Sequence, residues 1–299
     1  MIKVQNLTKK FGEKTVLEDI NFTVDKGSIY GLVGFNGAGK TTLIKCIAGV
    51  YEADEGCALI DSRNTFTDAA VRAGMFYVPD DIWFMPYSTL EKMGRFYSAY
   101  YPDFSFDTMD KLCEVFGLNK KAKLNSFSKG MQRQAEMILA VSAQPKVLLL
   151  DESLDGLDPA KRNIMNNMIL DYSAQKECSV IISSHNLSEI SDICDRVALI
   201  DGKRIVFDCC VDSVGENRCK YRLVFTDDKT PEDFAGFDVK KIKCDGKIVT
   251  LSLKGDREEN EAKLRAMSPV LTETFPLTLE EVFLEEMEGS EHDFTEIFS

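Results

Sequence analysis

The stretch that decides the fold is Gly34-Phe35-Asn36-Gly37-Ala38-Gly39-Lys40-Thr41-Thr42. It fits the pattern G-x-x-x-x-G-K-[ST], in which glycines let the backbone wrap closely around phosphate groups. An apolar run at 29–33 precedes it and a helical pattern at 41–48 follows, which is the strand–loop–helix setting that this pattern requires. The sequence therefore predicts a nucleotide site. We expect Lys40 to lie between the β- and γ-phosphates of ATP and Thr41 to bind Mg²⁺.

The residues expected to surround the phosphates extend along this whole loop. They are Gly34, Asn36, Gly37, Ala38, Gly39, Lys40, Thr41 and Thr42. Backbone N–H groups and the N-terminus of the following helix supply most of the attraction for the anion.

A second motif is the apolar run 147–150, which ends in Asp151 and Glu152. Ligands of parallel sheets bind at the carboxyl ends of the strands, where these two carboxylates emerge. We expect Asp151 to hold Mg²⁺ and Glu152 to act as general base toward the water that attacks the γ-phosphate. Alone, such a pair commonly marks only the end of a strand, but the phosphate loop upstream favours the catalytic interpretation.

His185 follows the apolar run 180–184 directly. If that strand is parallel to the one before Glu152, His185 emerges at the same edge of the sheet and can donate a hydrogen bond to the γ-phosphate. We predict this catalytic role. The alternative is an ordinary polar residue after a strand.

A third motif, Phe127-Ser128-Lys129-Gly130-Met131-Gln132-Arg133, stands just upstream of the Asp151 strand. With it, the ordered set of motifs resembles the ABC ATPases, and the resemblance covers residues 1 to about 208. It implies that Ser128 and Gly130 contact the γ-phosphate bound by a second copy. Read alone, a Ser-x-Gly at a helix start could be no more than an N-cap.

Three further positions take roles from this resemblance. Phe11 matches the aromatic residue that stacks on adenine, although it could instead be a core residue of the first strands. Asp158, in the segment 155–159, matches the key acid of the loop that contacts the partner cassette. Asp80 stands where the family usually has Gln, so we expect it near the metal and the attacking water.

Other details resemble one branch of the family, the ATP-binding subunits of two-component ABC-2-type bacterial exporters. They are the Ser-Lys-Gly-Met signature, the segment 100–103 and the segment 279–283. This resemblance implies a separate transmembrane permease, a second ATP-binding cassette (the same chain or a close relative) and a position at the cytoplasmic face of the membrane. The aromatic segment Trp83–Tyr87 is the expected permease contact, with burial in the core as the alternative.

Composition agrees with a soluble globular protein. The chain has 299 residues, a net charge of −13 and 44% hydrophobic residues. The acidic balance argues against a nucleic-acid partner, because binding phosphates requires clustered Lys and Arg. No stretch reaches the roughly 18 consecutive apolar residues that span a bilayer, and the N-terminus does not resemble a secretory signal.

The expected fold class is α/β, a P-loop NTPase ABC cassette with a mostly parallel sheet core, an antiparallel β part and a helical subdomain, followed by a small C-terminal α+β domain. The expected boundaries are 1–214 for the cassette, about 79–135 for its helical subdomain, 215–288 for the accessory domain and 289–299 for an acidic tail.

Two other functions compete with the exporter hypothesis. A soluble ABC ATPase acting on ribosomes or DNA would usually carry two cassettes or a long coiled coil, and this sequence has neither. An ATP-gated regulatory subunit with little hydrolysis is the second alternative, because Asp80 and the altered signature depart from the common pattern.

Overall fold

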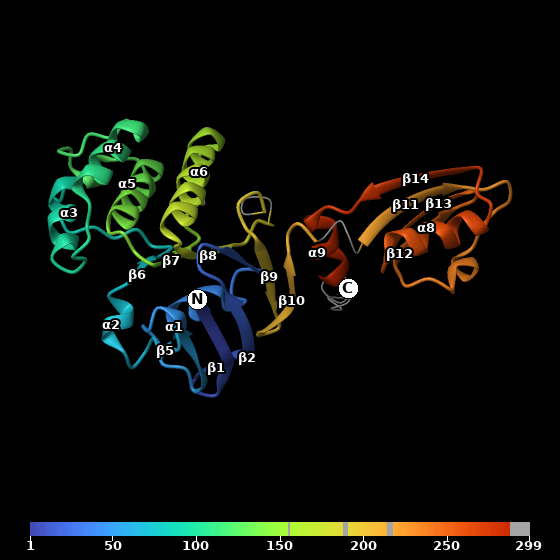
Figure 1. Cartoon of the computed structure of the whole chain (residues 1–299), viewed down its shortest axis with the longest axis horizontal. Coiled ribbons are helices and arrows are strands. Elements are labelled where there is room, and N and C mark those ends of the chain that lie inside the picture. The colour runs from blue at the N-terminus through green and yellow to red at the C-terminus, as the bar shows by residue number, and fades with distance from the viewer. Residues whose placement is uncertain (155, 188–190, 214–217, 288–299) are drawn as a thin grey trace, which may run out of the picture. The chain divides into compact units, whose positions relative to one another are not determined.

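The computed structural model describes residues 1–154, 156–187, 191–213 and 218–287 (Figure 1). The chain forms two compact units, Met1–Asp208 and Cys209–Ser299. Asp155 and the expected acidic tail at 289–299 lie outside the described residues. Within the described part, no helix combines the length and the apolar content needed to cross a bilayer.

The first unit is built on a six-stranded sheet in the order β10-β9-β3-β8-β7-β6. Its strands are β3 (Ile29–Val33), β6 (Met75–Val78), β7 (Val147–Asp151), β8 (Ser179–Ser184), β9 (Arg196–Asp201) and β10 (Arg204–Cys210). Every residue of β3, β7 and β8 is buried, as expected for central parallel strands covered on both faces. The parallel pairing of β6, β7, β8, β3 and β9 confirms the predicted parallel core.

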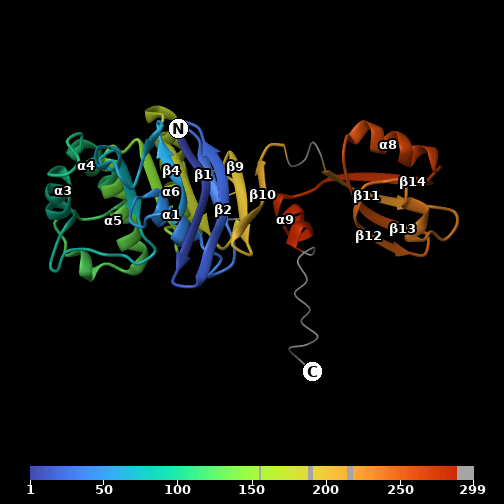
Figure 2. The same cartoon turned by 90° about the horizontal axis from the view of Figure 1, so that it is seen from below.

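A four-stranded antiparallel sheet, in the order β2-β1-β4-β5, lies against this core (Figure 2). Its strands are β1 (Ile2–Phe11), β2 (Lys14–Val24), β4 (Glu55–Ile60) and β5 (Arg63–Asn64). Helix α1 (Lys40–Ile47) packs between the two sheets, because Leu43, Ile44 and Ile47 are buried in one cluster with residues of both. Burying each such side chain stabilises the fold by about 1.5–3 kcal/mol. The helix that follows the phosphate loop is thereby held rigidly.

The remaining helices of the first unit are α2 (Ala69–Arg72), α3 (Leu90–Ser98), α4 (Phe106–Phe116), η1 (Leu124–Ser126), α5 (Lys129–Ser142) and α6 (Pro159–Lys176). Helices α3, α4 and α5 lie together with α6 next to α5, and α2 lies apart from them, near α1 and β5 (Figure 1). Helices α3 to α6 each begin at a residue whose side chain accepts a backbone N–H, namely Thr89, Ser105, Ser128 and Asp158. These caps fix where the helices start.

The second unit is a four-stranded antiparallel sheet in the order β12-β13-β11-β14. Its elements are β11 (Arg218–Val224), η2 (Pro231–Phe234), β12 (Val239–Asp245), β13 (Ile248–Lys254), α8 (Arg257–Ala266), β14 (Leu271–Pro276) and α9 (Leu279–Met287). These strands and helices form the small C-terminal α+β domain that the sequence predicts.

Five strands were not predicted: β5, β6, β10, β12 and β14. In β10 exposed and half-buried residues alternate, in β12 lysines separate the apolar residues, and both strands lie at the edge of a sheet, so neither has the long buried apolar run of a central strand. The alternation of apolar runs with helical patterns in the sequence predicts a helix between β8 and β9, and that segment includes residues 188–190, which lie outside the described residues.

Candidate nucleotide site

The phosphate loop connects β3 to α1 and has the backbone that the motif requires. Gly37 and Gly39 have φ values of 85° and 111°, which favour glycine. A Cβ on Gly39 would lie 2.8 Å from Leu17 Cδ2, so the loop also needs glycine there for space. Unlike α3 to α6, helix α1 has no side-chain N-cap, which leaves its first N–H groups available to an anion.

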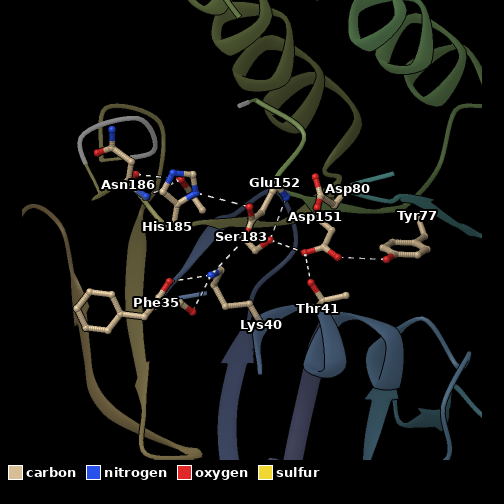
Figure 3. Close-up of polar contacts among 12 residues, drawn as sticks. Phe35, Lys40, Thr41, Tyr77, Asp80, Asp151, Glu152, Ser183, His185 and Asn186 are labelled. Atoms are coloured by element: carbon tan, nitrogen blue, oxygen red, sulfur yellow. Dashed lines mark hydrogen bonds and ion pairs between the residues drawn. The ribbon is translucent and has the colours of Figure 1, made fainter. Parts of the chain in front are cut away.

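Lys40 is buried and is held by the loop that precedes it (Figure 3). Its Nζ donates to the carbonyl of Gly34 at 2.7 Å and to that of Phe35 at 3.2 Å. The same Nζ lies 3.3 Å from Glu152 Oε1. The ammonium group therefore connects the phosphate loop to the end of β7.

Asp151 is completely buried and accepts hydrogen bonds from three hydroxyl groups. Ser183 donates to Oδ1 at 2.7 Å, Thr41 to Oδ1 at 3.1 Å and Tyr77 to Oδ2 at 3.2 Å. Burial, and then the neighbouring Asp151 charge, raise the pKa of Tyr77 above its usual value, so this hydroxyl stays protonated. A carboxylate beside a threonine hydroxyl is an all-oxygen donor pair of the kind that suits Mg²⁺.

Glu152 has an unusual backbone. Its φ is 48°, the left-handed region that non-glycine residues adopt at a cost of about 1–3 kcal/mol. Its N–H donates to Ser183 Oγ at 3.1 Å and to the Ser183 carbonyl at 3.2 Å, which stabilises this conformation. The carboxylate lies between Lys40 and His185, whose Nδ1 is 3.5 Å from Oε2 (Figure 3). Residues held in such strained conformations cluster at active sites.

Asp80 follows β6 and is tied to the signature helix α5. Arg133 donates from Nη1 to the Pro79 carbonyl at 2.7 Å, and from Nη2 to the carbonyl and, at 3.2 Å, to the Oδ1 of Asp80. Arg133 Nη1 also donates to Glu136 Oε2 at 3.0 Å. Partial burial and the nearby Glu152 charge raise the pKa of Asp80, while Arg133 opposes this shift.

These groups surround one hollow of about 250 Å³. Its lining residues are Val16, Asn36, Gly37, Gly39, Lys40, Thr41, Thr42, Asp80 and Glu152. The structure thus brings together most of the phosphate loop, the proposed base and Asp80. Asp151 lies beside Thr41, and His185 lies beside Glu152.

Eight predicted site residues do not line this hollow: Gly34, Ala38, Asp151 and His185, which adjoin residues that do, and Phe11, Ser128, Gly130 and Asp158. Phe11 is 47% exposed at the end of β1 and makes an edge contact with Tyr51. Ser128 is the exposed N-cap of α5, on which Gly130 lies, and Asp158 is the exposed N-cap of α6. In this chain alone, Ser128 and Asp158 therefore cap helices.

Three residues that contact the site were missed by the sequence analysis: Tyr77, Ser183 and Arg133. Ser183 carried a signal, because it is a hydroxyl residue two positions before His185 at the end of an apolar run. Tyr77 reaches Asp151 only because β6 pairs with β7, which the sequence pattern did not show.

The comparisons with known proteins agree with this geometry. Residues 17–155 match the family described as ABC transporter. The ABC transporter ATP-binding protein YtrB of Bacillus subtilis is 27% identical over 97% of this chain and 99% of its own length. An uncharacterized ABC transporter ATP-binding protein of Methanocaldococcus jannaschii, MJ1023, is 32% identical over 67% of this chain and 73% of its own.

A resistance protein and a solved structure are similar as well. The linearmycin resistance ATP-binding protein LnrL of Bacillus subtilis is 30% identical over 67% of this chain and 66% of its own length. A solved structure of the ATP-binding subunit of an ABC transporter superposes with a TM-score of 0.66 at 26% identity, over 72% of this chain and 91% of that one. The chain therefore belongs to the ABC transporter family, as an ATP-binding subunit with ATPase activity.

Proposed function

We propose that this chain is the motor subunit of an ABC exporter, in which two cassettes close around ATP and drive a separate permease chain at the cytoplasmic face of the membrane. The observation that carries the proposal is the convergence of Lys40, Glu152 and Asp80 on one hollow beside the buried Asp151. Similarity to LnrL, which is linked by its name to resistance, supports export as the direction.

In the proposed reaction, the phosphate loop holds the phosphates and Lys40 contacts them. Glu152 accepts the proton of the attacking water, and His185 donates a hydrogen bond to the γ-phosphate. Thr41 and Asp151 would hold Mg²⁺, which when bound neutralises charge on the phosphates. Asp80 orients the water from the other side, held in place by Arg133.

The second cassette supplies the remaining contacts. Ser128 and Asp158 are exposed at helix N-termini outside the hollow, so each is free to meet another subunit. Helix N-termini attract anions, and Ser128 with Gly130 would contact the γ-phosphate held by the partner. We propose a dimer of two copies or of this chain with a close relative.

The permease contact is proposed for the segment Trp83–Tyr87, which follows Asp80. Trp83 is 59% and Tyr87 70% exposed, so these rings do not form part of the core. Exposed aromatic groups of this size are typical of protein interfaces. Movement of Asp80 during hydrolysis would thus reach the permease over a few residues of chain.

Two experiments test this function. Purified Glu152→Gln should bind ATP, hydrolyse it at a small fraction of the wild-type rate and dimerise when ATP is present. Full activity of that variant would remove Glu152 as the base.

Affinity purification from detergent-solubilised membranes, followed by mass spectrometry, should recover a polytopic membrane protein in near-stoichiometric amount. The double variant Trp83→Ala/Tyr87→Ala should lose it. Tyr100→Ala, which removes an equally exposed ring (64%) elsewhere in the helical part, should retain it. Recovery of only soluble partners would overturn the transport proposal.

A further inference from the structure

The sheet of the second unit has two different faces. On one face, Tyr221, Leu223, Val249 and Leu251 are buried in a core that includes Leu264 of α8. Successive residues of a strand point to opposite faces, so the alternate positions lie on the other side. That second face carries charged and hydroxyl side chains instead of a core.

Register places these side chains in two neighbouring rows across β12, β13, β11 and β14. The first row is Lys241, Ser252, Lys220 and Phe275, and the second is Lys243, Thr250, Arg222 and Glu273. Neighbouring strands are about 4.8 Å apart, so the backbones of Arg222 and Lys243 are about 10 Å from each other, with Thr250 on the strand between them. Long side chains from both sides can therefore meet above Thr250.

Helix α9 borders this face and already places carboxylates on it. Glu281 Oε1 accepts from Lys220 Nζ at 2.9 Å, and this hydrogen bond lowers the pKa of the Glu281 carboxyl. Glu285 Oε1 accepts from Ser252 at 2.5 Å. Next to these contacts are two adjoining hollows of about 280 and 560 Å³, which share Lys220, Lys243, Thr250 and Glu281.

Two cations at the larger hollow are not neutralised by the protein. Among the described residues, neither Arg222 nor Lys243 forms a side-chain hydrogen bond or ion pair. Asp245 lines the same hollow, and Glu273 lies opposite Arg222, but neither is paired with these cations. Lys220 is already paired with Glu281, so Arg222 and Lys243 are the two cations left for a ligand, and a bound anion would relieve their mutual repulsion.

We propose that this hollow binds a small phosphate-bearing molecule, with its phosphate held over Thr250 by Arg222 and Lys243. The three oxygens of a phosphate can accept hydrogen bonds from two cations and a hydroxyl group at once. The protein's own carboxylate at this site, that of Glu281, is satisfied largely by Lys220. Ile248 and the 44% exposed Phe275 provide an apolar edge for the rest of the ligand. The volume is in the range of small-molecule sites.

The test uses the full chain carrying Lys40→Met, a substitution that weakens phosphate binding by the phosphate loop of the cassette. Inorganic phosphate is titrated by calorimetry, with citrate as the carboxylate comparison. Vesicles of phosphatidylglycerol or phosphatidylcholine, followed by sedimentation, distinguish a lipid headgroup from a free phosphate. Arg222→Gln/Lys243→Gln should weaken phosphate binding about tenfold or more, because two charge-assisted hydrogen bonds are lost.

A matched control removes the same charges from the other side of the sheet. Lys263→Gln/Arg265→Gln, on the exposed surface of α8, should leave phosphate binding unchanged. Glu281→Gln should tighten binding, since it removes a competing carboxylate while Gln can keep the bond to Thr278 N at the start of α9. That gain cannot arise from misfolding.

Selective sedimentation with phosphatidylglycerol and no binding of free phosphate would assign the phosphate to a lipid. Equal weakening in both double variants, stronger binding of citrate than of phosphate, or no binding of phosphate or vesicles would overturn the proposal.

Discussion

Arg133→Met tests the connection between the signature helix and the segment after β6. Arg133 and Glu136 form a buried pair, with side chains 8% and 9% exposed and Nη1 3.0 Å from Oε2. Breaking such a pair by removing one partner costs about 3–5 kcal/mol at a pH where the other partner stays ionised, because that charge is then buried without compensation. The free energy of unfolding, measured by urea denaturation, should fall by about this amount.

The penalty should depend on pH in a defined direction. Burial raises the pKa of Glu136 to about 7, and Arg133 holds it from rising further. A carboxyl with a raised folded-state pKa contributes stability that is complete below its unfolded pKa and is lost as pH rises through the folded one. Arg133→Met removes the group that favours the ionised form, so its penalty should be larger at about pH 8 than at about pH 6.

The double variant Arg133→Met/Glu136→Leu separates stability from function. It removes both partners, so the free energy of unfolding should return to within about 1–2 kcal/mol of the wild-type value. ATP turnover should be low in both the single and the double variant, because Pro79 and Asp80 are no longer tied to α5. A penalty for Arg133→Met below about 1 kcal/mol, or one equal at both pH values, would refute the reasoning.

Three further substitutions probe the site. Ser183→Ala removes the 2.7 Å bond to Asp151 and should raise the Mg²⁺ concentration for half-maximal ATPase activity about tenfold; an unchanged requirement would contradict this role. Asp80→Gln removes a carboxyl of raised pKa, so its relative ATPase activity should decline less than that of wild type as pH is lowered below neutral; identical pH profiles would exclude Asp80 as a titrating group. Phe11→Ala should weaken ATP binding about three- to tenfold without changing the melting temperature, since the ring is 47% exposed; a large loss of stability would instead make Phe11 a core residue.

The sequence predicts the parts of the site that lie close together along the chain. The phosphate loop has its own glycines, and Asp151, Glu152 and His185 each follow an apolar run. The parallel sheet then brings the ends of those runs together, as the resemblance and the strand pattern implied.

Contacts that depend on strand order were not predictable in the same way. Tyr77 and Ser183 reach Asp151 from the strands on either side of β7, and this order is a property of the folded sheet. Arg133 lies 53 residues from Asp80, and no local pattern connects them. In the second unit, the two rows of side chains exist only because β12 and β14, both unpredicted, pair with β13 and β11.

The position of Ser183 has a consequence for motion. Its hydroxyl bonds both the carboxylate of Asp151 and the backbone of Glu152, and its own strand leads within two residues to His185. Asp151, Glu152 and His185 therefore lie at the ends of two paired strands, β7 and β8, and the sheet fixes the distances between them. In the proposed mechanism, the timing of the chemical step would therefore come from the Asp80 segment and the second cassette, which approach these residues from outside. The site would then be switched on by assembly and not by displacement of the proposed base Glu152.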